Sequence, residues 1–282
     1  MVTCIGSTIG KMGMASCEMS TNQQINSIIS NTQTDSQYLY YAIQARFHRY
    51  SQSIAVQAVP ILSKSSFEQL KNYRPLLQEQ QKVGSFLDLI DRRITIQNKV
   101  IEKYESLIKA LCQILITSPN GTVCHIGDVL KIGSGKDHKH LNIGTIPVFG
   151  TGGYMLSVND WLYEGESVCI GRKGTIDNPF FVDGKFWTVD TLFYTYDFNG
   201  VLPKFCYYLF RTINWLQYNE ASGVPSLSKS TIERIQIRIP CMDEQAKAVQ
   251  VLDSVEMEIT CRRKLLNLYK SIKQYLISQL FI

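Results

Sequence analysis

The sequence predicts an α+β fold in which two domains of mixed α/β structure are joined by two long antiparallel coiled-coil helices. Three observations support this fold. The chain repeats itself, a helical apolar pattern follows each copy of the repeat, and short strand-like segments alternate with turns ahead of the second copy. With 282 residues, 45% of them hydrophobic and 19% charged, the chain has the size and composition of a globular protein with two domains.

The repeat needs no gap in the alignment. Residues 60–116 match residues 225–281 at an offset of 165 positions, and 19 of the 57 aligned positions are identical. Further upstream, Cys4-Ile5-Gly6 matches Cys169-Ile170-Gly171 at the same offset. Because chance would give only a few identities, we infer a duplication.

The duplication divides the chain into four segments. We expect a first domain in residues 1–74, a first long helix in 75–117, a second domain in 118–239 and a second long helix in 240–282. Nothing in the first copy matches residues 117–167 of the second. We therefore expect the first domain to lack its N-terminal part.

Each copy enters its long helix through a Pro-x-x-x-Glu-Gln motif. Proline suits the first helical turn because the N–H that it lacks would be unpaired there. An apolar residue then recurs at alternating four- and three-residue steps as far as Leu115 and Leu280, which is typical of a coiled-coil seam. The alternative is that each helix packs only on its own domain. The residues expected to pair the helices are Leu87, Ile94, Gln97, Tyr104, Leu252, Ile259, Arg262 and Tyr269.

The segment before the second helix has a mixed pattern. Alternating and β-branched residues predict strands at 145–149, 167–170, 180–182, 191–196 and 235–239. Residues 203–218 have the apolar spacing of an amphipathic helix, and residues 219–230 form a polar loop. The first copy has a similar ending, with a helix over 38–50 followed by a loop through Ser66.

Three stretches carry the groups that commonly contact nucleic acid. Arg172 and Lys173 lie between glycines, where both the backbone and the cations could approach phosphates. A second stretch supplies hydroxyls and a cation, and residues 131–140 have the composition of a flexible, basic loop. The alternative is a set of solvated turns with incidental charge. The remaining candidates are Ser226, Ser228 and Lys229, then Lys136, His138 and Lys139, and in the first domain Ser63 and Lys64.

Composition narrows the class of protein. The net charge of +5 permits a polyanionic partner, and no apolar run is long enough to span a membrane. The eight cysteines are scattered, which favours reduced thiols in a cytoplasmic protein, and no spacing indicates a metal site. Asn178-Pro179-Phe180-Phe181 is similar to a motif of amino-methyltransferases, but too little chain accompanies it for their doubly wound domain. A coiled-coil interaction protein without DNA binding is a second alternative.

Taken together, these features resemble the specificity (S) subunit of type I restriction-modification systems, with a first recognition domain that is truncated. The resemblance rests on the repeat, on the motif before each helix, and on four segments of the second copy, in this order. These segments are GTIPVFGTGGY at 144–154, ESVCIGRKGTI at 166–176, FWTVDTLFY at 186–194 and GVPSLSKSTIERIQIRIP at 223–240.

The resemblance implies a non-catalytic chain whose target recognition domains each read one half of a split DNA sequence. It implies double-stranded DNA, methyltransferase (M) subunits and a restriction (R) subunit as partners. Adenine methylation and DNA cleavage would belong to those partners, as would S-adenosylmethionine, ATP and magnesium, and this chain would hold no cofactor. Because the first domain is expected to be truncated, two chains could pair as a homodimer and read a palindrome.

Overall fold

The computed structural model describes residues 1–52, 61–117 and 121–281, with the side chains of 48–52 excepted. It divides into two compact units. The first unit contains residues 1–102 and 260–282, and the second contains residues 103–259. Each unit includes one end of each long helix.

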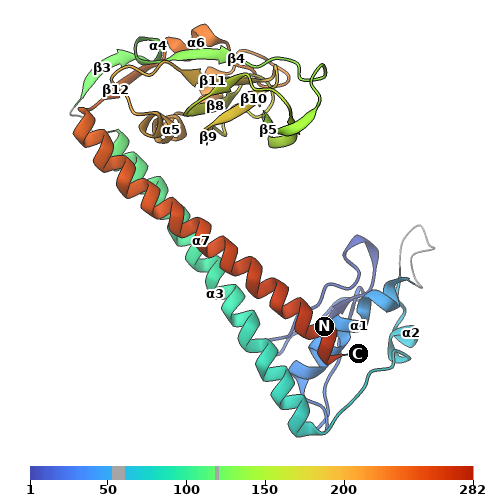
Figure 1. Ribbon diagram of the computed structural model, residues 1–282. Coiled ribbons are helices and arrows are strands. Elements are labelled where there is room, and N and C mark those ends of the chain that lie inside the picture. The colour runs from blue at the N-terminus through green and yellow to red at the C-terminus, as the bar shows by residue number, and fades with distance from the viewer. Residues whose placement is uncertain (53–60, 118–120, 282) are drawn as a thin grey trace. The chain divides into compact units, whose positions relative to one another are not determined.

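The second unit consists mainly of short antiparallel strands (Figure 1). One four-stranded sheet has the order β4-β11-β8-β9, and another has the order β6-β5-β10-β7, in which β10 and β5 run parallel. Strands β12 and β3 form a separate pair. The strands are β3 Thr122–His125, β4 Lys131–Ser134, β5 Ile143–Gly150, β6 Gly153–Val158, β7 Tyr163–Glu164, β8 Ser167–Gly171, β9 Phe180–Val182, β10 Lys185–Thr188, β11 Leu192–Tyr196 and β12 Gln236–Ile239. The five strands predicted from the sequence are therefore confirmed, with small shifts at their ends.

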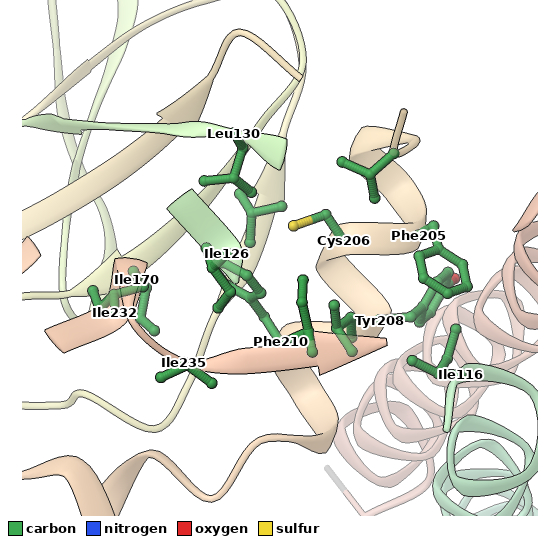
Figure 2. Packing of buried hydrophobic residues seen from close by; sticks show 14 of the residues in the cluster. Ile116, Ile126, Leu130, Ile170, Phe205, Cys206, Tyr208, Phe210, Ile232 and Ile235 are labelled. Carbon is green, nitrogen blue, oxygen red and sulfur yellow. The ribbon is translucent and has the colours of Figure 1, made fainter. Parts of the chain in front are cut away.

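One apolar core packs the helices of the second unit against its strands, and two smaller apolar clusters lie among the strands. Helix α5 (Pro203–Thr212) contributes Phe205, Cys206, Tyr208 and Phe210, all almost fully buried. Figure 2 shows Ile126, the first residue of helix α4 (Ile126–Val129), and Leu130, the residue after its end, close to Cys206. Helix α6 (Lys229–Glu233) adds Ile232 to the same core.

The predicted helix over 203–218 is wrong in its second half. Helix α5 ends at Thr212, Ile213 is extended, and a short 3-10 helix, η2 (Trp215–Tyr218), follows. The break has a packing cause. The Trp215 indole is buried against Phe210, with the ring centres 5.1 Å apart, and its Nε1 donates to the Phe210 carbonyl at 2.7 Å. The indole thus satisfies a carbonyl that a longer helix would have paired.

The first unit contains a smaller version of the same scaffold. Strands β1 (Val2–Thr3) and β2 (Ile25–Asn26) pair antiparallel, and the 3-10 helix η1 spans Gly6–Thr8. Helix α1 (Ser36–Gln52) confirms the helix predicted over 38–50. Helix α2 (Lys64–Glu68) begins within the residues predicted to end a loop, and it is the counterpart of α6.

The long helices are α3 (Leu77–Ile116) and α7 (Met242–Leu280), and in each unit they lie side by side and run in opposite directions (Figure 1). In the first unit Lys273 Nζ contacts Asp91 Oδ1 at 2.6 Å, and Leu87 packs with Phe281. In the second unit Ile108 and Leu252 share one core. Of the predicted pairing residues, Leu87, Gln97, Leu252 and Ile259 are buried, and Ile94, Tyr104, Arg262 and Tyr269 are half-buried.

The expected seam of α7 is wrong at its last position. Leu280 is 43% exposed, whereas the next residue, Phe281, is 7% exposed. Phe281 packs against Tyr38 of α1, with ring centres 5.3 Å apart. This aromatic contact explains why the side chain after Leu280, rather than Leu280 itself, faces inward.

A buried glutamine lies in the first turn of each long helix. Gln245 is fully buried; its Nε2 donates to the carbonyls of Pro240 and Gly200, both at 2.9 Å, and its Oε1 accepts from the Leu202 N–H at 2.8 Å. The amide thereby connects the start of α7 to the residues that lead into α5.

The first unit repeats this arrangement group for group. Gln80 is 1% exposed, and its Nε2 donates to the carbonyls of Pro75 at 2.8 Å and Gln33 at 3.2 Å. Its Oε1 accepts from the Asp35 N–H at 2.9 Å, just before α1. The duplication seen in the sequence is therefore also a duplication of one hydrogen-bond pattern.

A second shared contact joins the domain helices, α1 in the first unit and α5 in the second, to the long helices α3 and α7 respectively. The Tyr208 hydroxyl donates to Asp253 Oδ1 at 2.6 Å and to Glu256 Oε2 at 3.2 Å. In the first unit the Tyr41 hydroxyl donates to Asp91 Oδ2 at 2.7 Å. Burial and these bonds raise the pKa of both tyrosines well above the ordinary value near 10.

We expect Gln245→Leu to lower the free energy of unfolding of the second unit by about 3 kcal/mol or more. The substitution leaves two buried carbonyls and one buried N–H without partners, and each such group costs about 1–3 kcal/mol. Urea denaturation measures the loss. The matched control is Gln250→Leu on the exposed face of α7, which should change stability little; equal losses in the two variants would contradict this role.

Stability should also fall with alkaline pH. An unfolded tyrosine ionises above about pH 10, whereas folded Tyr208 keeps its proton, so the native state binds more protons there and stability decreases as pH rises. We expect Tyr208→Phe to flatten the decline in the free energy of unfolding between about pH 9 and pH 11.5, measured by urea denaturation. Tyr154→Phe, at an exposed position, is the control and should leave the slope as it is.

Candidate nucleic-acid interface

Two of the predicted DNA-facing stretches form one surface in the second unit. The Leu227 N–H donates to the Arg172 carbonyl at 2.9 Å, and the Gly174 N–H donates to the Pro225 carbonyl at 2.8 Å. Lys173 and Ser226 also form an isolated antiparallel bridge. These backbone bonds unite segments more than fifty positions apart in the sequence.

The surface is hollowed into a groove, which we call the cationic groove. Its lining residues combine three cations with one carboxylate and a few apolar groups. They are Ser134, Arg172, Lys173, Phe193, Glu220, Ala221, Val224, Ser226, Leu227, Ser228 and Lys229. With three positive charges against one, the groove favours an anionic ligand.

The turn that carries Arg172 and Lys173 is tightly constrained. Both backbone N–H groups donate to the Thr191 carbonyl, at 2.8 and 3.2 Å. A Cβ at Gly171 would lie 1.9 Å from the Thr175 carbonyl oxygen, and Gly174 has a φ of +98°, so both positions require glycine. The two cationic side chains are therefore held outward by a rigid backbone.

The Arg172 side chain contacts an aromatic ring and a backbone carbonyl of the same unit. The Arg172 guanidinium lies 5.9 Å from the centre of the Phe193 ring and donates to the Asp190 carbonyl at 3.4 Å. The Arg172 and Lys173 side chains are both exposed, and within the described part of the chain neither forms an ion pair. The exposed charges remain available to phosphate groups.

The hydroxyl groups of this region have a structural role that the sequence prediction missed. Ser228 Oγ caps α6 by accepting from the Thr231 N–H at 3.2 Å, and it donates to Glu220 Oε1 at 2.8 Å. The Thr231 hydroxyl donates to the same oxygen. These bonds lower the pKa of Glu220 below its ordinary value, so the carboxylate is ionised at neutral pH. Ser228 is thus a helix cap, not part of the expected open loop.

The third predicted stretch is not a flexible loop. Residues 131–134 form β4, and the segment after it is anchored by two backbone groups of Lys136. Its N–H donates to the Thr188 carbonyl, and its carbonyl accepts from Trp187 Nε1, both at 2.8 Å. Lys136 and Lys139 are exposed, and His138 is half-buried. Ser134 borders the cationic groove, whereas Lys136, His138 and Lys139 are not among the groove residues.

The first unit places its two candidates in the same local structure. Ser63 Oγ accepts from the Ser66 N–H at 3.1 Å and caps α2, as Ser228 caps α6. Lys64 is exposed and lies 3.8 Å from Glu68. At the offset of the repeat, Ser7 and Thr8 stand where the second unit has Arg172 and Lys173, so the first unit lacks this pair of cations.

Sequence reasoning missed the contributions of Phe193 and Glu220 to the groove. The predicted strand over 191–196 includes Phe193, but nothing in a single strand shows that Arg172 lies over its ring. Glu220 lies in the polar loop 219–230, where the prediction used only the serines and the lysine. The carboxylate within the segment NEASG, residues 219–223, was the signal that could have indicated a role for Glu220.

The described residues contain no group of three or more histidine, cysteine, aspartate or glutamate side chains arranged to hold a metal ion. All eight cysteines are free thiols, and burial raises the pKa of Cys169 and Cys206. Of the helices that can be described, none combines the length and the apolar character needed to cross a membrane.

Comparison with known proteins identifies the family. The model of a family described as "Type I restriction modification DNA specificity domain" matches residues 1–106 and 120–268. The chain belongs to this family. Its specificity domains thus account for nearly the whole sequence, in the two copies that the repeat predicts.

Individual relatives are distant. The Type I restriction enzyme EcoprrI specificity subunit of Escherichia coli is 22% identical over 139 residues, which cover 46% of this chain and 35% of that protein. The putative type I restriction enzyme specificity subunit S.HindORF215P of Haemophilus influenzae is 24% identical over 116 residues, covering 40% and 30%. The matched segments span about a third of each of these two curated relatives.

Solved structures share the fold. The type I restriction-modification S subunit from M. genitalium superposes with a TM-score of 0.73 at 19% identity, over 100% of this chain and 82% of that one. A structure described under complex assembly and conformational transition of the type I R-M system gives 0.59 at 14% identity, over 88% and 71%. At these identities the likeness shows the fold alone.

We expect Ser228→Ala to reduce the free energy of unfolding of the second unit by about 1 kcal/mol, the typical cost of losing an N-terminal helix cap. Urea denaturation measures this loss. Ser222→Ala, at an exposed loop position nearby, provides the comparison and should cost much less. The role of Ser228 as a cap would be refuted by an unchanged denaturation midpoint.

Proposed function

We propose that the chain acts as the DNA-reading specificity subunit of a type I restriction-modification complex, and that the cationic groove of its second unit contacts the duplex. The observation that carries this proposal is the joining of the Arg172–Lys173 turn to the Ser226–Lys229 segment in a member of the DNA specificity family. An exposed cation pair on a rigid turn is suited to phosphate contacts, which set the register of a protein on DNA.

Within the groove the roles divide by chemistry. Arg172, Lys173 and Lys229 would neutralise phosphates, which contributes affinity for any sequence. Glu220 would disfavour phosphate and could accept a hydrogen bond from the amino group of a cytosine. General affinity would therefore come from the cations, and the carboxylate would have a selective role.

The chain would be a binding subunit, with catalysis in its partners. We infer that methyltransferase subunits and a restriction subunit supply adenine methylation and cleavage, together with S-adenosylmethionine, ATP and magnesium. A cytoplasmic location follows from such a complex. The methyltransferase alternative is disfavoured by the topology, because the two four-stranded sheets are largely antiparallel and Phe180 and Phe181 belong to edge strand β9.

The two units would not contribute equally. The second unit has both cationic segments, whereas the first retains only the Ser63–Lys64 segment. Sequencing of methylated DNA from cells that carry the chain and its partners would show which halves of the target are specified. The symmetric homodimer expected from the sequence remains a prediction, and a palindromic motif would support it.

We expect Lys173→Ala to weaken binding to duplexes of any sequence and to reduce the slope of log K against log salt by about 0.9 for each phosphate that is no longer neutralised. Binding titrations at several salt concentrations measure both quantities. Lys247→Ala, on the exposed face of α7, removes the same charge outside the groove and should leave the slope unchanged. An unchanged slope for Lys173→Ala and for Lys229→Ala would show that the groove does not face DNA.

A further inference from the structure

The two units differ in what covers one side of their domain helices, α1 in the first unit and α5 in the second. At an offset of 167, Leu39 and Ile43 of α1 correspond to Cys206 and Phe210 of α5, since the tyrosine pairs Tyr40-Tyr41 and Tyr207-Tyr208 align there. At an offset of 165, Phe67 and Leu70 correspond to Ile232 and Ile235. The surroundings of these four positions can therefore be compared directly.

In the second unit these four positions are covered by the segment Thr122–Ser134, which comprises β3, α4 and β4. Ile126 and Leu130 are buried in the same core as Cys206 and Phe210, as Figure 2 shows. The Ile126 N–H donates to the Ile235 carbonyl at 3.1 Å. Strand β4 pairs with the far edge of β11, placing Ile132 opposite Thr195.

In the first unit the same positions line an open groove, which we call the apolar groove. Apolar side chains line one part of it, and polar or charged residues line the rest. The apolar residues are Ile25, Ile28, Ile29, Leu39, Ile43, Phe67 and Leu70, and the polar ones are Asn26, Ser27, Lys64, Glu68 and Asn72. Ile29 is 95% exposed, an unusual state for a large apolar side chain beside a groove. Strand β2, the counterpart of the end of β11, pairs with β1 on one edge, and no described residue pairs with its other edge.

Three further observations concern the same surface. Residues 71–74 correspond to β12, which pairs with β3 in the second unit, yet in the first unit they form no strand. Asn72 lies beside the groove, and its buried Oδ1 has no hydrogen-bond partner among the described residues. Glu68 corresponds to Glu233, against which Gly127 of α4 packs so closely that a Cβ there would lie 3.1 Å from the Glu233 Cβ. The contacts that receive Thr122–Ser134 thus have counterparts on which, among the described residues, no equivalent of β3, α4 and β4 packs, although Ile43 itself is buried.

We propose that the apolar groove binds a strand–helical turn–strand segment of a second polypeptide, similar in chemistry to Thr122–Ser134. Apolar side chains equivalent to Ile126 and Leu130 would lie on Leu39 and Ile43, and a strand equivalent to β4 would extend β2, the mode known as β-strand addition. The occupant is not a second copy of this chain, because in each copy the Thr122–Ser134 segment is already packed in its own second unit. The proposal rests on the repeat and is independent of DNA binding.

The test uses the complete 282-residue chain and a fluorescein-labelled synthetic peptide of residues 122–135. Fluorescence anisotropy should show saturable binding of one peptide per chain, and hydrogen exchange should slow over residues 25–29, which line the groove. Ile29→Asp should weaken binding by about tenfold or more, since it replaces apolar contact area by a charge. A peptide with Ile126→Asp and Ile132→Asp should not bind.

The matched control is Ile143→Asp, the same substitution at a position that is 96% exposed in the second unit. It should leave the peptide affinity unchanged, and because both isoleucines are almost fully exposed, both variants should fold. Absence of binding, or equal affinity for Ile29→Asp and the unmodified chain, would overturn the proposal. So would slower exchange only at Gln236–Ile239, which would place the peptide on the second unit. Sedimentation showing a dimer that Ile29→Asp abolishes would overturn it as well, by making a second copy the occupant.

Discussion

Each long helix has in its first turn a glutamine whose side-chain amide is buried and makes three hydrogen bonds. Gln80 and Gln245 each donate twice and accept once, and in each case one partner is the proline carbonyl at the helix entrance while the others precede the domain helix. A buried amide is costly unless all of its partners are present. These hydrogen bonds therefore fix the position of each domain helix relative to its long helix. The apolar cores on either side depend on that position.

The tyrosine contacts complete this junction. Tyr41 and Tyr208 point from the domain helices to acids on α3 and α7, and in the first unit Lys273 of the opposite long helix reaches the same Asp91. One polar cluster thus joins three helices in the first unit. The scaffold is duplicated in these polar contacts more faithfully than in its apolar side chains, since Leu39 and Ile43 correspond to Cys206 and Phe210. Direction-dependent bonds tolerate fewer substitutes than apolar packing does.

The elements that could be predicted from the sequence are those with a period or a repeat. The seam from Leu87 to Tyr104 and the strands Ser167–Gly171 and Leu192–Tyr196 have clear spacing, and the structure confirms them. The sequence indicated the separate segments of the cationic groove but not that they lie together. Backbone hydrogen bonds join them, such as that from the Leu227 N–H to the Arg172 carbonyl, and such bonds do not depend on side-chain type.

Glycine caused the clearest error. Gly133 and Gly135 made residues 131–140 look flexible, yet a Cβ would lie 2.1 Å from the Tyr194 ring at the first and 1.9 Å from the Val189 oxygen at the second. These glycines allow close packing, and that meaning is visible only once the neighbouring strand is known.

The short strand β2 bears on how this protein behaves in solution. A strand with an open edge is a template on which other chains can assemble into aggregates, and long flat edges are the most hazardous. With two residues, Ile25 and Asn26, this edge offers too few backbone groups for indiscriminate pairing. Lys64 and Glu68 also place charges at the edge of the adjacent apolar groove. The short edge therefore limits indiscriminate pairing, and for the docking proposed at the apolar groove it favours a chain that brings matching side chains.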